Sequence, residues 1–181
     1  SISPLVSGVG SLGGVSQYFS AAYANTLGLG GRLFNRFNFE KTNLLTVSTK
    51  PGQGEYSTIA SALSAVQSPS HDNRYVVLVG PGFFGEGSMN VPAFTSIVGS
   101  DIQGTLVYPT GNHNLFNSLA SSASINFLTV SGVQSGYIAF NLTNCGSFFL
   151  THKVSVYDCD TAYYSEDTTE DNLSYLEYVD I

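Results

Sequence analysis

The sequence predicts an all-β fold in which short strands wind into a solenoid, with one short helix near its start and an extended N-terminal arm. From Thr105 onward the chain is a succession of short apolar runs between polar corners, and helical periodicity is absent. One short helical segment precedes the first fully apolar strand. The triplet at 127–129 (Phe-Leu-Thr) recurs at 149–151, a shift of 22 positions that fits one circuit of a solenoid.

A short helix is expected after Ser57 or Thr58. Either side-chain oxygen can cap it by accepting from a first-turn amide that has no partner within the helix. Ile59, Leu63 and Val66 then follow at spacings of four and three, which gives one apolar stripe about two turns long. The sequence therefore predicts a thin amphipathic helix that lies with this stripe against another layer.

A buried strand and a sharp corner follow the helix. Residues 75–79 (Tyr-Val-Val-Leu-Val) are apolar without alternation, as expected of a strand that is covered on both faces. Residues 80–82 (Gly-Pro-Gly) force a corner, because glycine supplies positive φ and proline fixes φ. Further short segments follow at close intervals, at 83–86 (Phe-Phe-Gly-Glu), 91–92 (Val-Pro) and 96–99 (Ser-Ile-Val-Gly).

In this order, the helix, the apolar strand, the glycine corner and the short segments resemble the first coil of pectin-lyase-like right-handed β-helices. They are especially similar to the opening of pectinesterases and of phage and virus tailspike, fibre and spike proteins. The resemblance implies a right-handed parallel β-helix in which the short α-helix caps the N-terminal end of the solenoid. It covers about 55 residues closely and roughly the next 70 loosely, and it concerns the fold rather than the chemistry.

An antiparallel sandwich is the rival fold, since it also uses many short strands. The strands here are very short, and a capping helix is expected. Neither Asn-Gly nor Asp-Gly, the usual residues of tight hairpin turns, occurs in the sequence. These features favour the solenoid.

Residues 1–40 are expected to form a Gly/Ser-rich arm that anchors the chain to a partner, and residues 41–181 the β-helix domain. The glycines of the arm do not form a phosphate loop, because none is followed directly by Lys-Ser or Lys-Thr. Residues 175–181 are typical of another strand rather than of a cap, and the end of a solenoid needs a cap or a partner. We therefore expect the β-helix to continue beyond Ile181, in further sequence or in neighbouring chains.

The composition narrows the class of protein. Charged residues make up only 10% of the chain and its net charge is −7, which argues against nucleic-acid binding because that requires basic surfaces. No run approaches the roughly eighteen apolar residues that a membrane-spanning helix needs. Solubility must come from Ser, Thr, Asn and Gly, a composition common in extracellular and virion β-proteins.

The sequence offers little support for a catalytic site. Pectinesterase-like catalysis needs two aspartates and an arginine, but no Lys or Arg follows Lys153, so no catalytic residue is carried over from the resemblance. His71, His113 and His152 are expected to be exposed and non-catalytic. Glu86 is expected to hold a turn amide or to face water. Neither a cofactor nor a metal ion is expected.

The two cysteines, Cys145 and Cys159, lie fourteen positions apart, without the spacing of zinc ligands. Stacked on neighbouring coils they would be buried thiols or a disulfide. Buried thiols are favoured, because a buried cysteine behaves as a small hydrophobic residue. Asn141 and Asn172 begin glycosylation triplets, a pattern that often arises by chance.

The candidate contact residues for a glycan or a cation gather near the C-terminus. Asp158 and Asp160 are expected on one face of a strand, where two carboxylates would meet a sugar or a cation. A calcium site completed by residues 166–171 is one interpretation, and a solvated acidic loop is the commoner one. The exposed aromatic patch is expected at Tyr157, Tyr163 and Tyr164, and the interior phenylalanines at Phe127, Phe140 and Phe149.

These observations favour a virion structural protein: a spike, fibre, tailspike or minor capsid component with a β-helical stem. The link to virions rests on the family resemblance. Expected partners are other virion or capsid proteins through residues 1–40, further copies of the chain, and a host glycan, but neither nucleic acid nor a membrane. The alternative is a secreted, extracellular carbohydrate-active protein, either a pectinesterase- or lyase-like enzyme or a glycan-binding adhesin.

Overall fold

The computed structural model describes residues 43–143, 149–165 and 174–180, which belong to one compact unit, Phe39–Ile181. The predicted arm, 1–40, lies outside the described residues, so its anchoring role stays a prediction. The described residues form one helix, α1 (Ile59–Ser64), and twelve strands: β1 (Leu44–Val47), β2 (Tyr75–Val79), β3 (Gly82–Glu86), β4 (Met89–Val91), β5 (Thr95–Gly99), β6 (Thr105–Pro109), β7 (Phe116–Leu119), β8 (Ser124–Ser131), β9 (Ile138–Asn141), β10 (Phe149–Tyr157), β11 (Thr161–Tyr164) and β12 (Ser174–Asp180).

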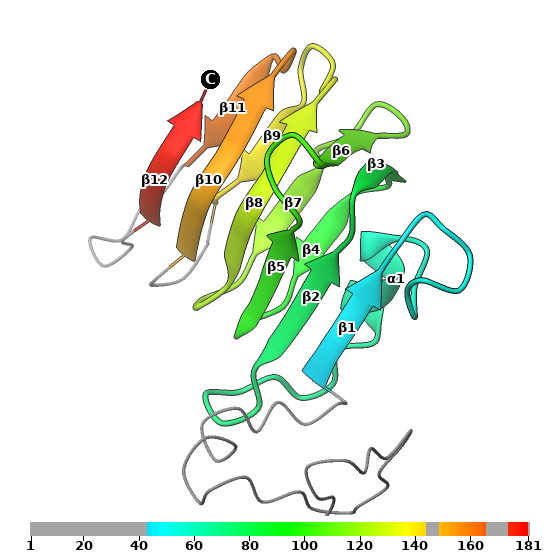
Figure 1. Cartoon of the computed structure of the whole chain (residues 1–181). Coiled ribbons are helices and arrows are strands. Elements are labelled where there is room, and N and C mark those ends of the chain that lie inside the picture. The colour runs from blue at the N-terminus through cyan, green and yellow to red at the C-terminus, as the bar shows by residue number, and fades with distance from the viewer. Residues whose placement is uncertain (1–42, 144–148, 166–173, 181) are drawn as a thin grey trace, which may run out of the picture. The chain divides into compact units, whose positions relative to one another are not determined.

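Every strand pairs in parallel with the strand of the next coil, which confirms the predicted parallel β-helix (Figure 1). One sheet runs β1-β2-β5-β8-β10-β12, and it is extended sideways by β6, which pairs with β8, and by β3, which pairs with β6. The second sheet runs β4-β7-β9-β11. Successive coils are therefore β2-β3-β4, β5-β6-β7, β8-β9 and β10-β11. Strands β8 and β10 are long enough to span two sides of the coil.

The coils differ in length, so the predicted repeat of 22 residues is wrong. Val77 pairs with Ile97, 20 positions later, whereas Ile97 pairs with Ile125, 28 positions later. Leu128 pairs with Val154, a shift of 26, and not with the leucine of the second Phe-Leu-Thr triplet. The apolar residues that face the interior set the strand register, and the corners between strands vary in length from coil to coil.

A column of inward-facing side chains runs through the first sheet, one from each coil. By register, Leu45, Val77, Ile97, Ile125 and Thr151 lie directly above one another, and all five are buried. Each parallel strand contributes every second residue to this interior. The interior column supplies the repeated packing that holds neighbouring coils together.

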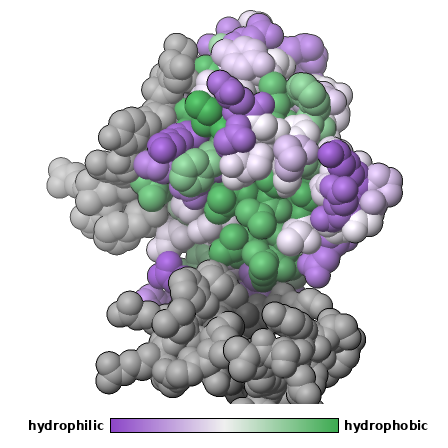
Figure 2. All heavy atoms as spheres, viewed as in Figure 1, coloured by the Kyte–Doolittle hydropathy of each residue, from purple (hydrophilic) through white to green (hydrophobic). Residues whose placement is uncertain are grey.

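The outer face of the first sheet is open, so the prediction of a β2 strand covered on both faces is wrong. Burial alternates along β2, and Leu78 is exposed. Its apolar outward residues continue onto the strands on either side of β2. Figure 2 shows the resulting apolar area over β1, β2 and β5, which comprises Leu44, Val76, Leu78 and Val98.

Aromatic rings form a second stack, in the sheet β4-β7-β9-β11. The ring of Phe140 lies 4.9 Å from that of Phe116 and 4.8 Å from that of Tyr163, centroid to centroid, and both pairs are nearly parallel. Phe140 is fully buried, as predicted. Phe127 is instead half-buried at a corner with φ of 56°, and the side chain of Phe149 lies outside the described residues.

The helix α1 packs against β1, β2, β3 and β4, at the N-terminal end of the solenoid (Figure 1). Of the two predicted caps, Thr58 holds the N-cap position, and its Oγ1 accepts from the Ser61 amide at 3.1 Å. Ile59, Ala62 and Leu63 are buried. The helix therefore covers the end of the interior column, as the resemblance implied.

Candidate functional site

An uncharged aromatic face lies on the side of the solenoid formed by β3, β6 and the C-terminal halves of β8 and β10. Phe84, Val107, Val130 and Val156 point inward on these strands and are buried. Their neighbours therefore point outward, because side chains alternate along a strand. The outward residues, which we call the lateral face, are Phe83, Gly85, Leu106, Tyr108, Thr129, Ser131, Ser155 and Tyr157, although Thr129 and Ser131 on β8 are buried.

Three rings dominate the lateral face. Phe83 is 73% exposed, Tyr108 39% and Tyr157 51%. The pairing of Val107 with Val130 places Tyr108 beside Ser131, and Ser131 pairs with Tyr157. Since neighbouring strands are about 4.8 Å apart, the α-carbons of the two tyrosines are roughly 10 Å apart along the solenoid axis.

Gly85 is what allows the ring of Tyr108 to lie against the sheet. A Cβ atom at Gly85 would be 3.0 Å from Tyr108 Oη and 3.1 Å from its Cζ, closer than most Cβ contacts allow. The exposed rings offer flat apolar surface, and the tyrosine hydroxyls add hydrogen-bonding capacity. Such a surface suits a partner that is itself uncharged, for instance a neutral glycan or a polar protein surface.

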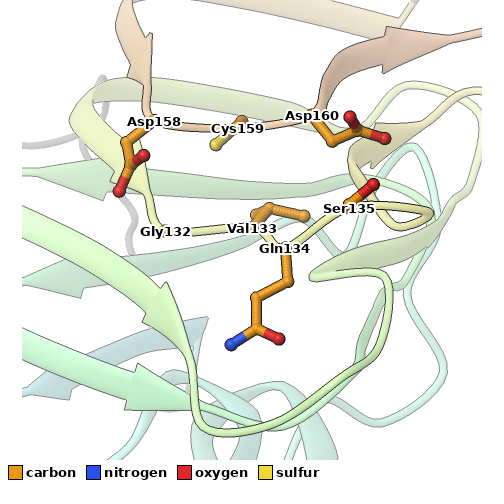
Figure 3. Close-up of a pocket in the computed structure, with 7 residues that line it drawn as sticks. All are labelled: Gly132, Val133, Gln134, Ser135, Asp158, Cys159 and Asp160. Carbon is orange, nitrogen blue, oxygen red and sulfur yellow. The ribbon is translucent and has the colours of Figure 1, made fainter.

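An open corner hollow of about 520 Å³ begins next to Tyr157. Two stacked corners line it, 132–135 from one coil and 158–160 from the next (Figure 3). Backbone hydrogen bonds hold the corners together: the Gly132 amide donates to Asp158 O at 3.0 Å, and the Asp160 amide donates to Val133 O at 3.1 Å. The hollow is thus a rigid feature of the stack.

The predicted arrangement of Asp158 and Asp160 on one face of a strand is wrong. Both residues lie in the corner between β10 and β11, and Asp158 has φ of 52°. Figure 3 shows their carboxylates pointing away from each other. Asp160 Oδ2 accepts from the Gly136 amide at 2.9 Å, so this carboxylate helps to hold the corner of the preceding coil.

A calcium site completed by residues 166–171 cannot be assessed, because that loop lies outside the described residues. Among the residues that the structure describes, no three His, Cys, Asp or Glu side chains are grouped so as to hold a metal ion. Cys159, which lines the corner hollow, is a free and half-buried thiol. Its Sγ donates to Tyr157 O at 3.3 Å, and burial raises the pKa of the thiol. Cys145 is not described.

Tyr163 does not belong to an exposed patch, contrary to the prediction, because its ring is stacked on Phe140. Burial raises the pKa of Tyr163 to about 12, an effect that the nearby Thr151 hydroxyl partly offsets. The two hydroxyls do not form a hydrogen bond with each other, and both are buried without a partner among the described residues. Tyr164, on β11, is 41% exposed, as expected.

The Tyr163→Phe substitution is expected to raise the free energy of unfolding by about 1 kcal/mol at neutral pH, because it removes an unpaired buried hydroxyl. The folded state holds the phenol proton more tightly than the unfolded state, so ionisation of Tyr163 does not affect stability below pH 10 and lowers it as pH rises from 10 towards 12. The variant should therefore lose less stability over that range. Urea unfolding at neutral pH and at a pH between 10 and 12 measures both effects. Tyr157→Phe, a change at an exposed tyrosine, is the control and should alter neither the stability at neutral pH nor its loss at high pH.

The histidines lie on separate parts of the fold. His71 Nδ1 is 3.0 Å from Asp72 Oδ1, in a loop where both side chains are almost fully exposed. His152 packs edge-on against Phe127 at 5.3 Å. His113 and His152 are half-buried rather than exposed, and His113 Nε2 is 3.3 Å from the carbonyl oxygen of Glu86. Glu86 holds backbone amides, as one of the two predictions had it, but these belong to α1 and not to its own turn.

Sequence reasoning missed Phe83 and Tyr108. The signal was present, since of two adjacent residues in a strand, such as Phe83 and Phe84, one must point outward. The prediction that an early strand is covered on both faces left no exposed side on which Phe83 or Tyr108 could lie.

No protein-family model, no curated protein and no solved structure matches the chain. Within the described residues, no helix has the length and apolar character needed to cross a membrane. The fold and the lateral face therefore define the chain as a parallel β-helix protein with an exposed, uncharged aromatic side.

Proposed function

We propose that the chain is a structural component of a virion: a spike, fibre, tailspike or minor capsid protein whose β-helix forms a rigid stem. Residues 1–40 attach it to other virion or capsid proteins, and the lateral face contacts a host glycan during attachment. The observation that supports this role is the exposure of three rings on one side of the stacked coils, with Tyr108 and Tyr157 in one row of the register and Phe83 in the neighbouring row. Rigid scaffolds that carry exposed aromatic rings are suited to recognition.

We also propose kinship with the pectin-lyase-like β-helices found in tailspike and fibre proteins. The support is the order of elements, in which the cap α1 precedes the coil β2-β3-β4. Assembly into homo-oligomers belongs to the same proposal, and the apolar area over β1, β2 and β5 supplies a surface that association would bury.

Mass photometry of the chain from its native source tests the structural role. A large assembly that contains several copies is the expected result, and a free monomer contradicts the proposal. A second test addresses attachment. Particles that carry Tyr108→Ala and Tyr157→Ala should bind host cells at least about tenfold more weakly, since two buried aromatic contacts together contribute more than 1.4 kcal/mol. Tyr164→Ala, a change at a similarly exposed tyrosine on β11, should leave binding unchanged.

The second candidate function is a secreted carbohydrate-active protein. The observation that favours it is the corner hollow, which lies next to Tyr157 and is lined mainly by polar groups. Turnover of pectin or of a host glycan by the purified chain would support this function, provided that Asp158→Asn abolishes it.

A further inference from the structure

Asn141 ends β9 in the second sheet, and it begins the triplet Asn-Leu-Thr. Phe140 before it and Leu142 after it are buried, so Asn141 points outward between them. The Leu142 amide donates to the carbonyl oxygen of Tyr164 at 2.7 Å, which fixes this part of the chain to the following coil. The triplet is thus held at the end of a strand, with its first residue facing away from the interior.

The side-chain amide of Asn141 uses only its oxygen. Oδ1 accepts from the Thr143 amide at 3.0 Å, which closes a turn across the triplet. Nδ2 makes no hydrogen bond within the described part of the chain, and this atom is not buried, although the residue as a whole is half-buried. The nitrogen can therefore carry a substituent while the hydrogen bond that closes the turn is kept.

The hydroxyl of Thr143 has no use in the folded structure. Its Oγ1 is buried and has no hydrogen-bond partner in the described part of the chain. A buried hydroxyl without a partner costs stability, and valine, which has nearly the same shape, would pack there without this cost. Residues that break such a rule of local packing are expected at functional positions. The hydroxyl is therefore more readily explained by recognition of the triplet before folding than by packing.

Tyr164 lies beside Asn141 on the next coil. The two residues are paired in register, so their α-carbons are about 4.8 Å apart. Tyr163 points into the interior, where it stacks on Phe140, and Tyr164 therefore points outward and is 41% exposed. An exposed ring at this position offers a flat apolar surface to the C–H face of a sugar that is attached to the neighbouring nitrogen.

We propose that Asn141 is an N-glycosylation site, whose Nδ2 carries a glycan with N-acetylglucosamine as its first sugar. Asn-x-Ser/Thr is the acceptor pattern for this modification in secreted proteins. The donor is a lipid-linked oligosaccharide diphosphate. A bond forms between Nδ2 and the anomeric carbon, the bond from that carbon to the diphosphate oxygen breaks, and the amide loses one proton as the lipid diphosphate departs.

The order of events follows from the burial of Thr143 Oγ1. Recognition of the triplet requires access to this hydroxyl, so the transfer precedes the folding of the coil. After folding, Nδ2 remains on the outer side of the sheet and the glycan lies over Tyr164. The modification adds one requirement to the proposed function, namely that the chain passes through a eukaryotic secretory compartment.

Peptide mapping of the chain from its native source tests the site directly. Treatment with a peptide-N-glycosidase in heavy-oxygen water converts a glycosylated asparagine into an aspartate that carries the heavy oxygen. The label is expected at Asn141, and an unmodified Asn141 would overturn the proposal. The result is independent of the virion role, since a glycosylated free monomer would contradict that role and still carry this site.

Variants secreted from cultured eukaryotic cells test which residues direct the modification. The full-length wild type should carry a glycan at Asn141 that Asn141→Gln and Thr143→Val both remove, which a faster electrophoretic band shows. Thr143→Val should also unfold at a urea concentration no lower than the wild type does, because only an unpaired hydroxyl is lost. Asn172→Gln, which removes the second triplet, is the control and should leave the glycan at Asn141 in place. A glycan at Asn141 that persists in Thr143→Val, or a secreted wild type without one, would overturn the proposal.

Discussion

The Phe140→Ala substitution is expected to lower the free energy of unfolding by about 3 to 5 kcal/mol, the usual cost of removing a large aromatic side chain from a core. Phe140 is fully buried and lies between two other rings, at centroid distances of 4.9 Å and 4.8 Å. Its removal would leave a gap that neither Phe116 nor Tyr163 can fill without leaving its own coil. Because domains are stable by only about 5 to 15 kcal/mol, this loss approaches the whole stability.

Urea unfolding followed by circular dichroism measures the effect, and Phe83→Ala is the matched control. The same atoms are removed from a side chain that is 73% exposed, so stability should change by less than about 0.5 kcal/mol. Equal losses in the two variants would contradict the assignment of Phe140 to the interior and Phe83 to the lateral face. The Phe83→Ala variant also shows whether the lateral face contributes to folding or is free to serve recognition.

The features that sequence reasoning predicted correctly depend on local physical chemistry. Thr58 caps α1 because its side chain reaches an amide three residues away, and Ile59 and Leu63 share a buried helix face because of helical spacing. The parallel β-helix itself required the resemblance to known proteins in addition to the short apolar runs. Neither of these sources specified how residues from different coils align.

Several of the wrong predictions concern the alignment of residues from different coils. Asp158 and Asp160 looked like strand neighbours, but both lie in the corner between β10 and β11, where Asp158 has positive φ and the alternation of a strand does not hold. Tyr163 was expected in the exposed aromatic patch. Its position is set by Phe140, which lies 23 residues earlier in sequence and directly beneath it in register. Such contacts depend on the length of each coil, which the sequence pattern does not specify.

The arrangement of the lateral face also depends on how the coils align. Tyr108 and Tyr157 lie 49 positions apart in sequence, yet both flank Ser131 on the lateral face. Only the register of three coils places them together. A change that shifts one coil relative to the next should therefore damage both the core and the lateral face.

Gly99 is the position at which such a shift is easiest to produce. It ends β5, and the corner of the next coil passes close to it: a Cβ atom at Gly99 would clash with the carbonyl oxygen of Phe127 and lie 3.0 Å from Leu128 Cβ. Phe127 has φ of 56° and belongs to the corner that turns β8. Because the obstructing oxygen is a backbone atom, no change of side-chain rotamer can relieve the contact.

The Gly99→Ala substitution is therefore expected to lower the free energy of unfolding by about 3 kcal/mol, at the upper end of the usual cost of overpacking a core. Gly87→Ala is the matched control, since a Cβ atom there would meet nothing within 4 Å and the backbone is not left-handed. That variant should be unchanged or more stable by up to about 1 kcal/mol, because alanine restricts the unfolded chain. The two variants are compared by the urea concentration at the midpoint of unfolding. The comparison holds if the free energy of unfolding falls with urea concentration at the same slope in both.

The same pair of variants tests whether the lateral face depends on coil register. If the corner at Phe127 has to move to admit a methyl group, Thr129 and Ser131 move with it, because they continue the same strand β8. On the proposed role in attachment, folded Gly99→Ala particles should then bind host cells more weakly than Gly87→Ala particles, although neither glycine belongs to the lateral face. Full binding by a destabilised Gly99→Ala variant would show instead that the face tolerates a shift of one coil, and that recognition relies on single rings rather than on their alignment.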